Sequence, residues 1–248
     1  DVRFEGLINL DETAFNKIRN GIEDKLEVTL KAILEGKNEK EVRTLWAEIC
    51  QAEVEFADKY ATTYSAVTPS NIDVPSAVAA LEASASGLNW TFAPNVDISN
   101  DARWGRVMEG AGEDTYLGSK IAYTRVKGFQ GNKLGDLNSV MACVKHFAAY
   151  GAGVGGRDYN SVDMSERMLW ETYLPPFKSA LDAGAATFMN SFNDLNGIPA
   201  TGNKFLQRDI LKGKWNFDGF VITDWASIKE MINHGFAADG KEASQRAV

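Results

Sequence analysis

Residues 221–225 read VITDW, an apolar run of β-forming residues that ends in Asp224 and is followed at once by the aromatic Trp225. In proteins that alternate strands and helices, ligands bind at the carboxyl ends of the strands, so a carboxylate at this point is placed for chemistry. Asp is also a preferred N-cap residue, and capping of the following helix is the alternative interpretation of Asp224. Arg, Lys and His near other predicted strand ends favour the first interpretation.

The alternation of β-rich runs with helical periodicity extends along the whole chain, which is the signature of βα units around a parallel sheet. Seven strands are predicted, at residues 2–9, 26–33, 55–63, 89–98, 140–147, 186–192 and 218–223. Helices are predicted at residues 75–86, 114–128, 164–183, 203–213 and 226–233. A further helix is expected to start at Asn38, with Glu41 as its capping-box partner.

This order of elements predicts an α/β fold of the (βα)8 TIM-barrel type, incomplete by one βα unit. A doubly wound open sheet is the alternative. Such sheets carry a Gly-rich phosphate turn after the first strand, whereas residues 7–15, LINLDETAF, contain no glycine. No segment has the composition of a linker, so a single barrel domain is expected over residues 1–248.

Composition excludes several classes of partner. The chain has 248 residues, of which 44% are apolar, and can bury a large core. A net charge of −8 argues against a nucleic-acid partner, because phosphate binding depends on clustered Lys and Arg. No apolar run approaches the roughly 18 residues needed to cross a bilayer, and residues 1–10 lack the layout of a secretion signal. A soluble protein without a membrane partner is therefore expected. Cys50 and Cys143 both lie in apolar patterns typical of unpaired, buried cysteines, so the cysteines do not indicate the redox compartment, and the localisation is unknown.

Charged residues follow the predicted strand 89–98. They are Arg103, Arg106, Glu109, Glu113 and Asp114. A guanidinium group offers a planar fork of donors that suits vicinal sugar hydroxyls or a carboxylate. A network of exposed Arg–Glu pairs is the alternative interpretation of this loop.

The predicted strand 140–147 carries Lys145 and His146 near its carboxyl end. Neighbouring residues of a strand point to opposite faces, so only one of the two is expected to enter the barrel unless the strand ends or kinks between them. His146 could equally be a hydrogen-bonded core residue. His234, in the last helical pattern, is predicted to be structural or exposed.

Asparagine and aspartate gather around the end of the predicted strand 186–192, at Asn190, Asn193, Asp194 and Asn196. Such side chains are typical hydrogen-bonding partners of carbohydrates. The Asn-Gly pair at 196–197 is also a strong turn signal, and both interpretations stand at this point.

Taken together, residues 83–248 closely resemble the amino-terminal barrel domain of family 3 glycoside hydrolases, especially bacterial β-glucosidases. The matching runs are NWTFAPNVDIS (89–99), DARWGRVMEGAGEDTYLG (101–118), VKGFQG (126–131), CVKHFAAYG (143–151), SFNDLNGIPATGN (191–203) and WNFDGFVITDW (215–225). The resemblance implies a retaining O-glycosyl hydrolase. Such enzymes hold two carboxyl groups about 5–5.5 Å apart, one a nucleophile and the other first an acid and then a base.

By this resemblance Asp224 is the catalytic nucleophile and Trp225 walls the sugar site. Arg106, Lys145 and His146 bind hydroxyls of the sugar ring in subsite −1. A positive charge near Asp224 favours its ionised form, which the attack requires. The resemblance implies a small carbohydrate ligand, no metal and no cofactor.

Parts of the family pattern are not found. The family's acid/base usually lies on a carboxyl-terminal domain, so that domain or a partner is expected to be missing, and residues 148–160 lack the His-containing loop that a subgroup uses instead. The carboxylates available in the chain are Glu109, Glu113, Asp158 and Asp163. The family's early Asp that binds sugar hydroxyls has no counterpart in residues 1–82, and Phe192 stands where many members have Tyr. The chain alone is therefore expected to be weakly active or inactive.

Residues 1–82 resemble, more loosely, part of a class I aldolase barrel of the deoxyribose-phosphate aldolase kind. The similar runs are VRFEGLINLDETAF (2–15), KLEVTLKAILEG (25–36) and EVRTLWAEICQAEVEFADKYATTYS (41–65). Lys59 falls near that family's Schiff-base lysine, although a solvated or helix-adjacent lysine is the favoured interpretation. Arg3 stands roughly where the family keeps an Asp. Two resemblances in one chain suggest a hybrid barrel. A non-catalytic or engineered chimeric scaffold is thus the alternative function, and a Schiff-base aldolase using Lys59 is a further one.

Overall fold

The computed structural model describes residues 74–136 and 138–247, together with residues 31, 35–38, 40, 41 and 44. The chain divides into two compact units, Asp1–Ser70 and Asn71–Val248, and most of the described residues belong to the second.

The first unit is described at few positions. The predicted strands 2–9 and 55–63 lie outside the described residues, as does Lys59. Of the predicted strand 26–33 only Lys31 is described, and it is helical, so the strand prediction is wrong at this residue. The predicted helix start is confirmed, because the backbone N–H of Glu41 donates to the Asn38 side chain at 3.1 Å.

The second unit is built around a parallel sheet in the order β1 (Cys143–Phe147), β2 (Thr187–Asn190) and β5 (Phe220–Ile222). These strands lie inside three of the predicted ones. A short antiparallel hairpin, β3 (Asp194–Leu195) and β4 (Ile198–Pro199), follows β2. The structure thus confirms a parallel α/β fold and shows part of the sheet that a barrel would need.

The predicted strand 89–98 runs parallel to β1 but joins it through isolated bridges, Trp90 with Met141 and Asn95 with Lys145. Between them lies Pro94, which has no backbone N–H to donate to a ladder. The carbonyls of Ala93 and Pro94 still accept from the N–H groups of β1. This segment therefore acts as the outer neighbour of β1 without forming a regular strand.

Helices connect and cover these strands. They are α3 (Val74–Ala85), α4 (Thr115–Gln130), α5 (Glu166–Met168), the π-helical η4 (Leu169–Tyr173) and η6 (Phe205–Lys214), α6 (Pro175–Asp182), α7 (Ser227–Asn233) and α8 (Gly240–Arg246). Short 3-10 turns are η1 (Val107–Glu109), η2 (Tyr150–Ala152), η3 (Val154–Gly156) and η5 (Ala200–Gly202). Among the described residues, every helix falls short of the length and apolarity needed to cross a bilayer.

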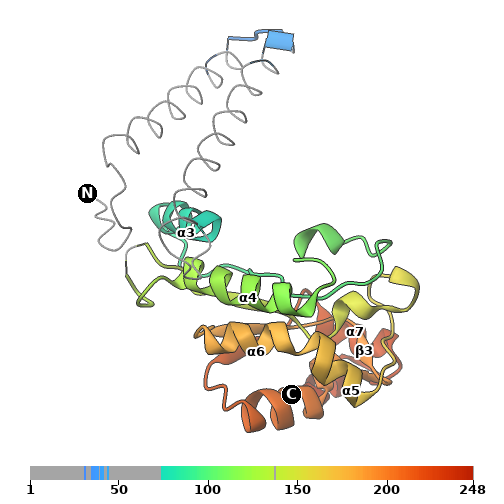
Figure 1. Ribbon diagram of the computed structural model, residues 1–248. Helices are drawn as coiled ribbons and strands as arrows, with labels where there is room; N and C mark the ends of the chain where they lie inside the picture. Colours follow the sequence, from blue (N-terminus) through green and yellow to red (C-terminus); the bar gives the residue numbers. More distant parts are fainter. Residues whose placement is uncertain are drawn as a thin grey trace. The chain divides into compact units, whose positions relative to one another are not determined.

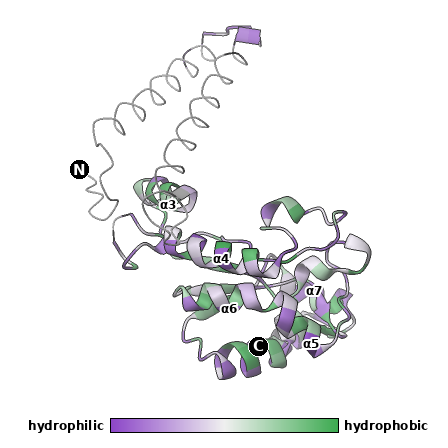
Figure 2. Cartoon of the chain, viewed as in Figure 1, coloured by the Kyte–Doolittle hydropathy of each residue, from purple (hydrophilic) through white to green (hydrophobic). Residues whose placement is uncertain are grey.

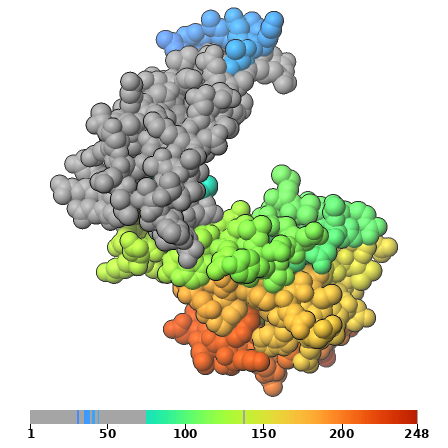
Figure 3. Space-filling view, viewed as in Figure 1, coloured from blue at the N-terminus to red at the C-terminus, as the bar shows by residue number. Residues whose placement is uncertain are grey.

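Helix α4 illustrates how local sequence sets these elements. The Asp114 side chain accepts the N–H of Leu117 at 2.6 Å and caps its start, and Gly131 ends it with a φ of +63°. The helix packs along α6 (Figure 1), and it carries both hydrophobic and hydrophilic residues along its length (Figure 2). Its outer side chains form a continuous band on the surface of this unit (Figure 3).

The last residue of α4, Gln130, joins the beginnings of β1 and β2. Its side-chain oxygen accepts the backbone N–H groups of Ala142 at 3.2 Å and Ala186 at 3.0 Å. Its side-chain nitrogen donates to the carbonyl of Gly184 at 2.8 Å. One buried amide therefore satisfies three backbone groups that the short strands leave unpaired.

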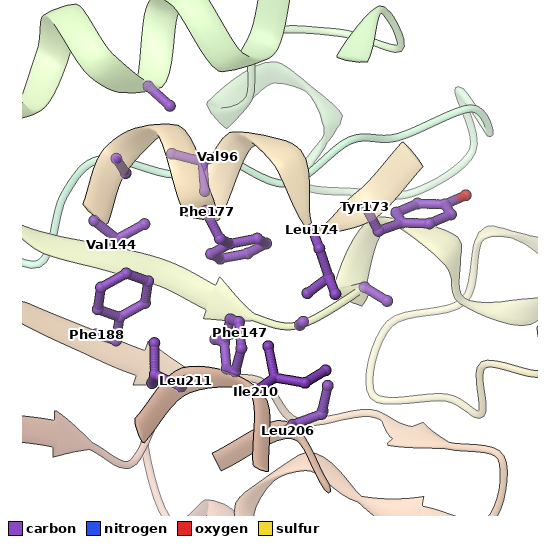
Figure 4. Packing of buried hydrophobic residues seen from close by; sticks show 14 of the residues in the cluster. Val96, Val144, Phe147, Tyr173, Leu174, Phe177, Phe188, Leu206, Ile210 and Leu211 are labelled. Carbon is purple, nitrogen blue, oxygen red and sulfur yellow. The ribbon is translucent and has the colours of Figure 1, made fainter. Parts of the chain in front are cut away.

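The main core lies between the sheet and its covering helices (Figure 4). Phe147 of β1 meets Phe177 of α6 and Phe188 of β2 edge-on, with ring centroids 5.2 and 5.9 Å apart. On the other side of these rings, η6 contributes Leu206, Ile210 and Leu211. Each fully buried side chain of this kind stabilises the fold by about 1.5–3 kcal/mol.

The opposite face of the sheet is more open. Thr187 alternates with Phe188 along β2 and so faces away from the core. Its hydroxyl accepts from the ring N–H of Trp90 at 3.1 Å, and Trp90 packs edge-on against Phe92 and Phe220. Phe92 is 50% exposed and Phe220 is 48% exposed.

Candidate active site

His146, on β1, is fully buried and is held by a carboxylate that the sequence did not single out. Its Nδ1 lies 2.7 Å from Oδ2 of Asp97, and its backbone N–H donates to the same carboxylate at 3.3–3.4 Å. Asp97 is 2% exposed. A carboxylate at Nδ1 favours a proton on that nitrogen and directs Nε2 to the other side of the ring.

Asp97 carried a signal in the sequence. It stands between Val96 and Ile98, which are both buried, so a charged side chain interrupts an apolar run. A buried charge needs a partner, and His146 on the adjacent strand supplies it.

Asp224 reaches the free side of the His146 ring from the end of β5. Its Oδ2 lies 3.5 Å from Nε2 of His146, and its side chain is 16% exposed. Among the described residues, neither of these two buried atoms has a hydrogen-bond partner. Two polar groups thus face each other at the carboxyl ends of β1 and β5 with hydrogen-bonding capacity to spare.

The alternative role of Asp224 as a helix cap is wrong. Helix α7 begins at Ser227 after Ala226, and no side chain caps it. The Oδ1 of Asp224 instead accepts the backbone N–H of Trp225 at 2.6 Å.

Lys145 and His146 are neighbours on β1, where the pairing with β2 is irregular between Val144 and Phe147. The peptide bond between them is cis. Lys145 influences the carboxyl group of Glu109. The pKa of Glu109 is held below the ordinary value first by the bonded Arg106, and further by the charge of Lys145, against the opposing effect of burial. Lys145 therefore lies near the loop that carries Glu109.

Arg106 belongs to the same cluster. Its Nε and Nη2 donate to the two oxygens of Glu109 at 2.7 and 2.8 Å, a bidentate pair that raises the pKa of the guanidinium. The guanidinium carbon lies 5.6 Å from the ring centre of Tyr150, whose ring meets that of His146 edge-on at 5.1 Å. Burial raises the pKa of the Tyr150 hydroxyl, and the neighbouring Asp158 adds to this effect.

The remaining candidates are placed differently. Trp225 is 88% exposed, directly beside Asp224. Of the four candidate acid/base carboxylates, Glu109 is bound to Arg106, and Asp158 accepts the ring N–H of Trp104 at 3.2 Å. Glu113 and Asp163 are exposed.

The polar stretch after β2 forms a turn. Asn196 and Gly197 have φ values of +53° and +83° and connect β3 to β4, as the Asn-Gly signal predicts. The Asn196 side chain bonds both backbone groups of Met164 at 2.9 Å. Asp194 accepts the N–H of Gly197 at 3.0 Å. These side chains therefore serve the local backbone.

His234 is predicted from the sequence to be either structural or exposed, and the structure shows a structural role. It follows the last residue of α7, and its side chain is 14% exposed. Its Nε2 lies 2.9 Å from the carbonyl oxygen of Phe192, and its Nδ1 lies 3.5 Å from Asp194. The end of α7 is thereby fixed to the segment that follows β2.

The family profile described as "Glycosyl hydrolase family 3 N terminal domain" matches residues 59–248. The chain belongs to this family. The match includes residues 59–82, which the sequence resemblance assigns to the aldolase-like part.

Relatives of this family member include "Periplasmic beta-glucosidase" of Salmonella typhimurium, 52% identical over 171 residues that cover 69% of this chain and 22% of the relative. A "Beta-xylosidase" of Formosa agariphila is 39% identical over 166 residues, covering 65% of this chain and 23% of the relative. The solved beta-glucosidase of Listeria innocua in complex with glucose has a TM-score of 0.69 at 50% identity, covering 70% of this chain and 24% of that one. The chain thus spans about a quarter of the length of these relatives.

Proposed function

We propose that this chain supplies the nucleophile and the sugar-binding side of a retaining β-glucosidase active site. The observation that carries the proposal is the 3.5 Å approach of Asp224 Oδ2 to His146 Nε2, with neither atom otherwise hydrogen-bonded among the described residues. Relatives named β-glucosidases, one of them solved with glucose, support a glucoside as the substrate.

In the first step, a carboxylate oxygen of Asp224 bonds to the anomeric carbon while the bond to the leaving oxygen breaks. That oxygen takes a proton from the acid. In the second step, water loses a proton to the same group and displaces Asp224, so that the sugar leaves with its original configuration. Lys145, at the carboxyl end of β1, contributes a positive charge to the same end of the sheet as Asp224, which must be ionised to attack.

The same cluster offers partners for sugar hydroxyls. With the His146 proton on Nδ1, its Nε2 accepts a hydrogen bond, and a hydroxyl of the sugar can donate to it. Arg106 and Lys145 carry charged N–H groups that can donate hydrogen bonds to the hydroxyl oxygens of a sugar. The exposed ring of Trp225 offers an apolar wall for one face of a pyranose.

The acid/base group comes from outside residues 71–248 in this proposal. Glu109 and Asp158 already bind Arg106 and Trp104, and the relatives extend well beyond the matched region. General acid catalysis contributes about 10²–10⁴-fold. The chain alone should therefore cleave a dinitrophenyl β-glucoside, whose leaving group needs little protonation, far better than it cleaves cellobiose.

We also infer that the open face around Trp90 is the interior of a barrel. Parallel sheets are covered on both faces, and the half-exposed Phe92 and Phe220 mark where further strands would pack. That residues 1–248 form one barrel, with aldolase-like units in residues 1–82, remains a prediction.

The test is covalent trapping of Asp224. The full chain is incubated with 2,4-dinitrophenyl 2-deoxy-2-fluoro-β-glucoside, which forms a slowly hydrolysed glycosyl ester, and intact and peptide masses are measured. We expect a single label on Asp224 that is absent in Asp224→Asn. The matched control is Asp218→Asn, an exposed carboxylate in the same run, which should be labelled like the native chain. No label on the native chain, or a label on Asp224→Asn, would overturn the proposal.

A further inference from the structure

The turn that carries Asp224 is held by few packing contacts. The N–H of Ser227 donates to the carbonyl of Asp224 at 3.1 Å, which closes a turn over Trp225 and Ala226. Both of these central residues are exposed. Ala226 has a φ of +56°, in the left-handed region that a residue with a Cβ seldom adopts. Neither side-chain burial nor backbone preference therefore explains why the turn keeps this form.

A buried hydroxyl contact lies beneath the turn. Ser227 is 2% exposed, and its hydroxyl is hydrogen-bonded to the hydroxyl of Thr201 at 3.0 Å. The Thr201 hydroxyl donates to Oδ1 of Asn190, the last residue of β2, at 3.3 Å. Thr201 and Asn190 are 2% and 1% exposed. Thr201 thus connects the end of the central strand to the first residue of α7.

We propose that Thr201 is a positioning residue for Asp224, which it fixes in place through Ser227. The proposal rests on the role of Asp224 as nucleophile. β5 borders only β2 among the described strands, so its carboxyl end has no second strand to hold it. The Thr201 hydroxyl provides a directional link in place of one. A misplacement of about 1 Å can cost about 10²-fold in rate, so a small relaxation of the turn is measurable.

The rest of α7 does not depend on this link. Met231 of α7 is buried, and His234 holds the far end of the helix through Phe192. Loss of the Thr201 hydroxyl should therefore release the turn while α7 stays in place. This separates positioning from folding in the experiment.

The experiment compares Thr201→Val, which keeps the shape and removes the hydroxyl, with Thr201→Ser, which keeps the hydroxyl. The control is Thr187→Val. This change also removes a buried hydroxyl, but one that lies on β2 and donates to the carbonyl of Ala142. Trapping by the fluoroglucoside is measured across reagent concentrations on the full chain, which separates the binding constant from the rate constant for bond formation.

We expect Thr201→Val to lower the rate constant about 10- to 100-fold with little change in the binding constant. Thr201→Ser should restore the native rate constant to within about 3-fold, and Thr187→Val should lower the melting temperature without slowing trapping. A native rate constant in Thr201→Val, or no rescue in Thr201→Ser, would overturn the positioning role.

A second measurement does not require turnover. Hydrogen exchange of the Ser227 amide should quicken in Thr201→Val and remain slow in Thr187→Val. Unchanged exchange in Thr201→Val contradicts the proposal even if the native chain is not labelled. Absence of labelling in the native chain, with faster exchange in Thr201→Val, instead contradicts the nucleophile assignment and leaves the link to the turn supported.

Discussion

The two strands that carry the proposed site are held in different ways. β1 lies between the 89–98 segment and β2. All its residues except Lys145 are buried, and its His146 is bonded to a buried carboxylate. β5 lies at the border of the described sheet, is partly exposed along its length, and is followed by a turn that contributes Asp224. His146 is thus fixed by burial and by its hydrogen bond to Asp97, whereas Asp224, the proposed nucleophile, is fixed by directional hydrogen bonds of its turn. Changes near β1 should mainly cost stability, and changes near β5 should cost geometry as well.

The largest effect is expected at Asp97. Asp97→Ala leaves Nδ1 of the buried His146 without a partner, and the free energy of unfolding should fall by about 3 kcal/mol, as measured by urea denaturation. Asp97→Asn keeps an acceptor oxygen, so its free energy of unfolding should fall by less than that of Asp97→Ala. Asp101→Ala, which removes a carboxylate bonded to the exposed Arg103 in the following loop, is the control and should scarcely shift the midpoint. An unchanged midpoint in Asp97→Ala would show that the buried pair does not hold the end of β1.

A smaller effect is expected at Gly219, immediately before β5. A Cβ added there would meet the carbonyl oxygen of Ala186, and would lie 2.5 Å from the ring of Phe217, closer than real Cβ contacts. Gly219→Ala should therefore displace β5 from β2, lower the free energy of unfolding by about 2 kcal/mol, and slow the trapping of Asp224.

Gly240→Ala is the control for this change, because a Cβ at the start of α8 meets nothing within 4 Å. Stability close to the native value in Gly219→Ala, measured by the same denaturation, would mean that β5 is not tightly placed against β2. The difference in how firmly β1 and β5 are held would then be larger than described.

The smallest effect is expected at Glu109, the partly exposed partner of Arg106. Its side chain is 38% exposed, so Glu109→Gln should lower stability at pH 7 by about 0.5 kcal/mol or less. Because Arg106 lowers the pKa of Glu109 in the folded chain, the contribution is present above the ordinary Glu pKa and is lost as pH falls through the lowered value.

Melting temperatures measured between pH 7 and pH 3 test whether the contribution of Glu109 to stability is lost as the pH falls. The difference between the native chain and Glu109→Gln should shrink toward low pH, and Glu113→Gln, an exposed glutamate of the same loop, serves as control. A difference that grows toward low pH would contradict the assigned direction of the pKa shift.

Much of this arrangement could be predicted from the sequence. Helices α4 and α7 agree with the predicted 114–128 and 226–233 to within two residues. Apolar periodicity is a local signal in both, and the Asp114 cap adds a second one in α4. The approach of His146 and Asp224 followed from a simple rule, that parallel strands share their carboxyl end.

The parts that could not be predicted depend on contacts between distant segments. Asp97 meets His146 only through the register of the 89–98 segment against β1, which no local pattern encodes. The hydroxyl contact between Thr201 and Ser227 has no periodicity. Helix α8 is different, because Asp239 and Glu242 formed a capping signal that was available in the sequence and was missed.

Gln130 has a further consequence for how such a protein can change over time. Its amide joins the beginnings of β1 and β2 to each other, at the end of the sheet opposite His146 and Asp224. The strand register, and with it the position of His146 along β1, is therefore set at the end of the sheet away from the proposed site. Loops at the opposite rim can accordingly be lengthened, shortened or exchanged during evolution without erasing that alignment. The scaffold and the specificity of the site can therefore diversify separately.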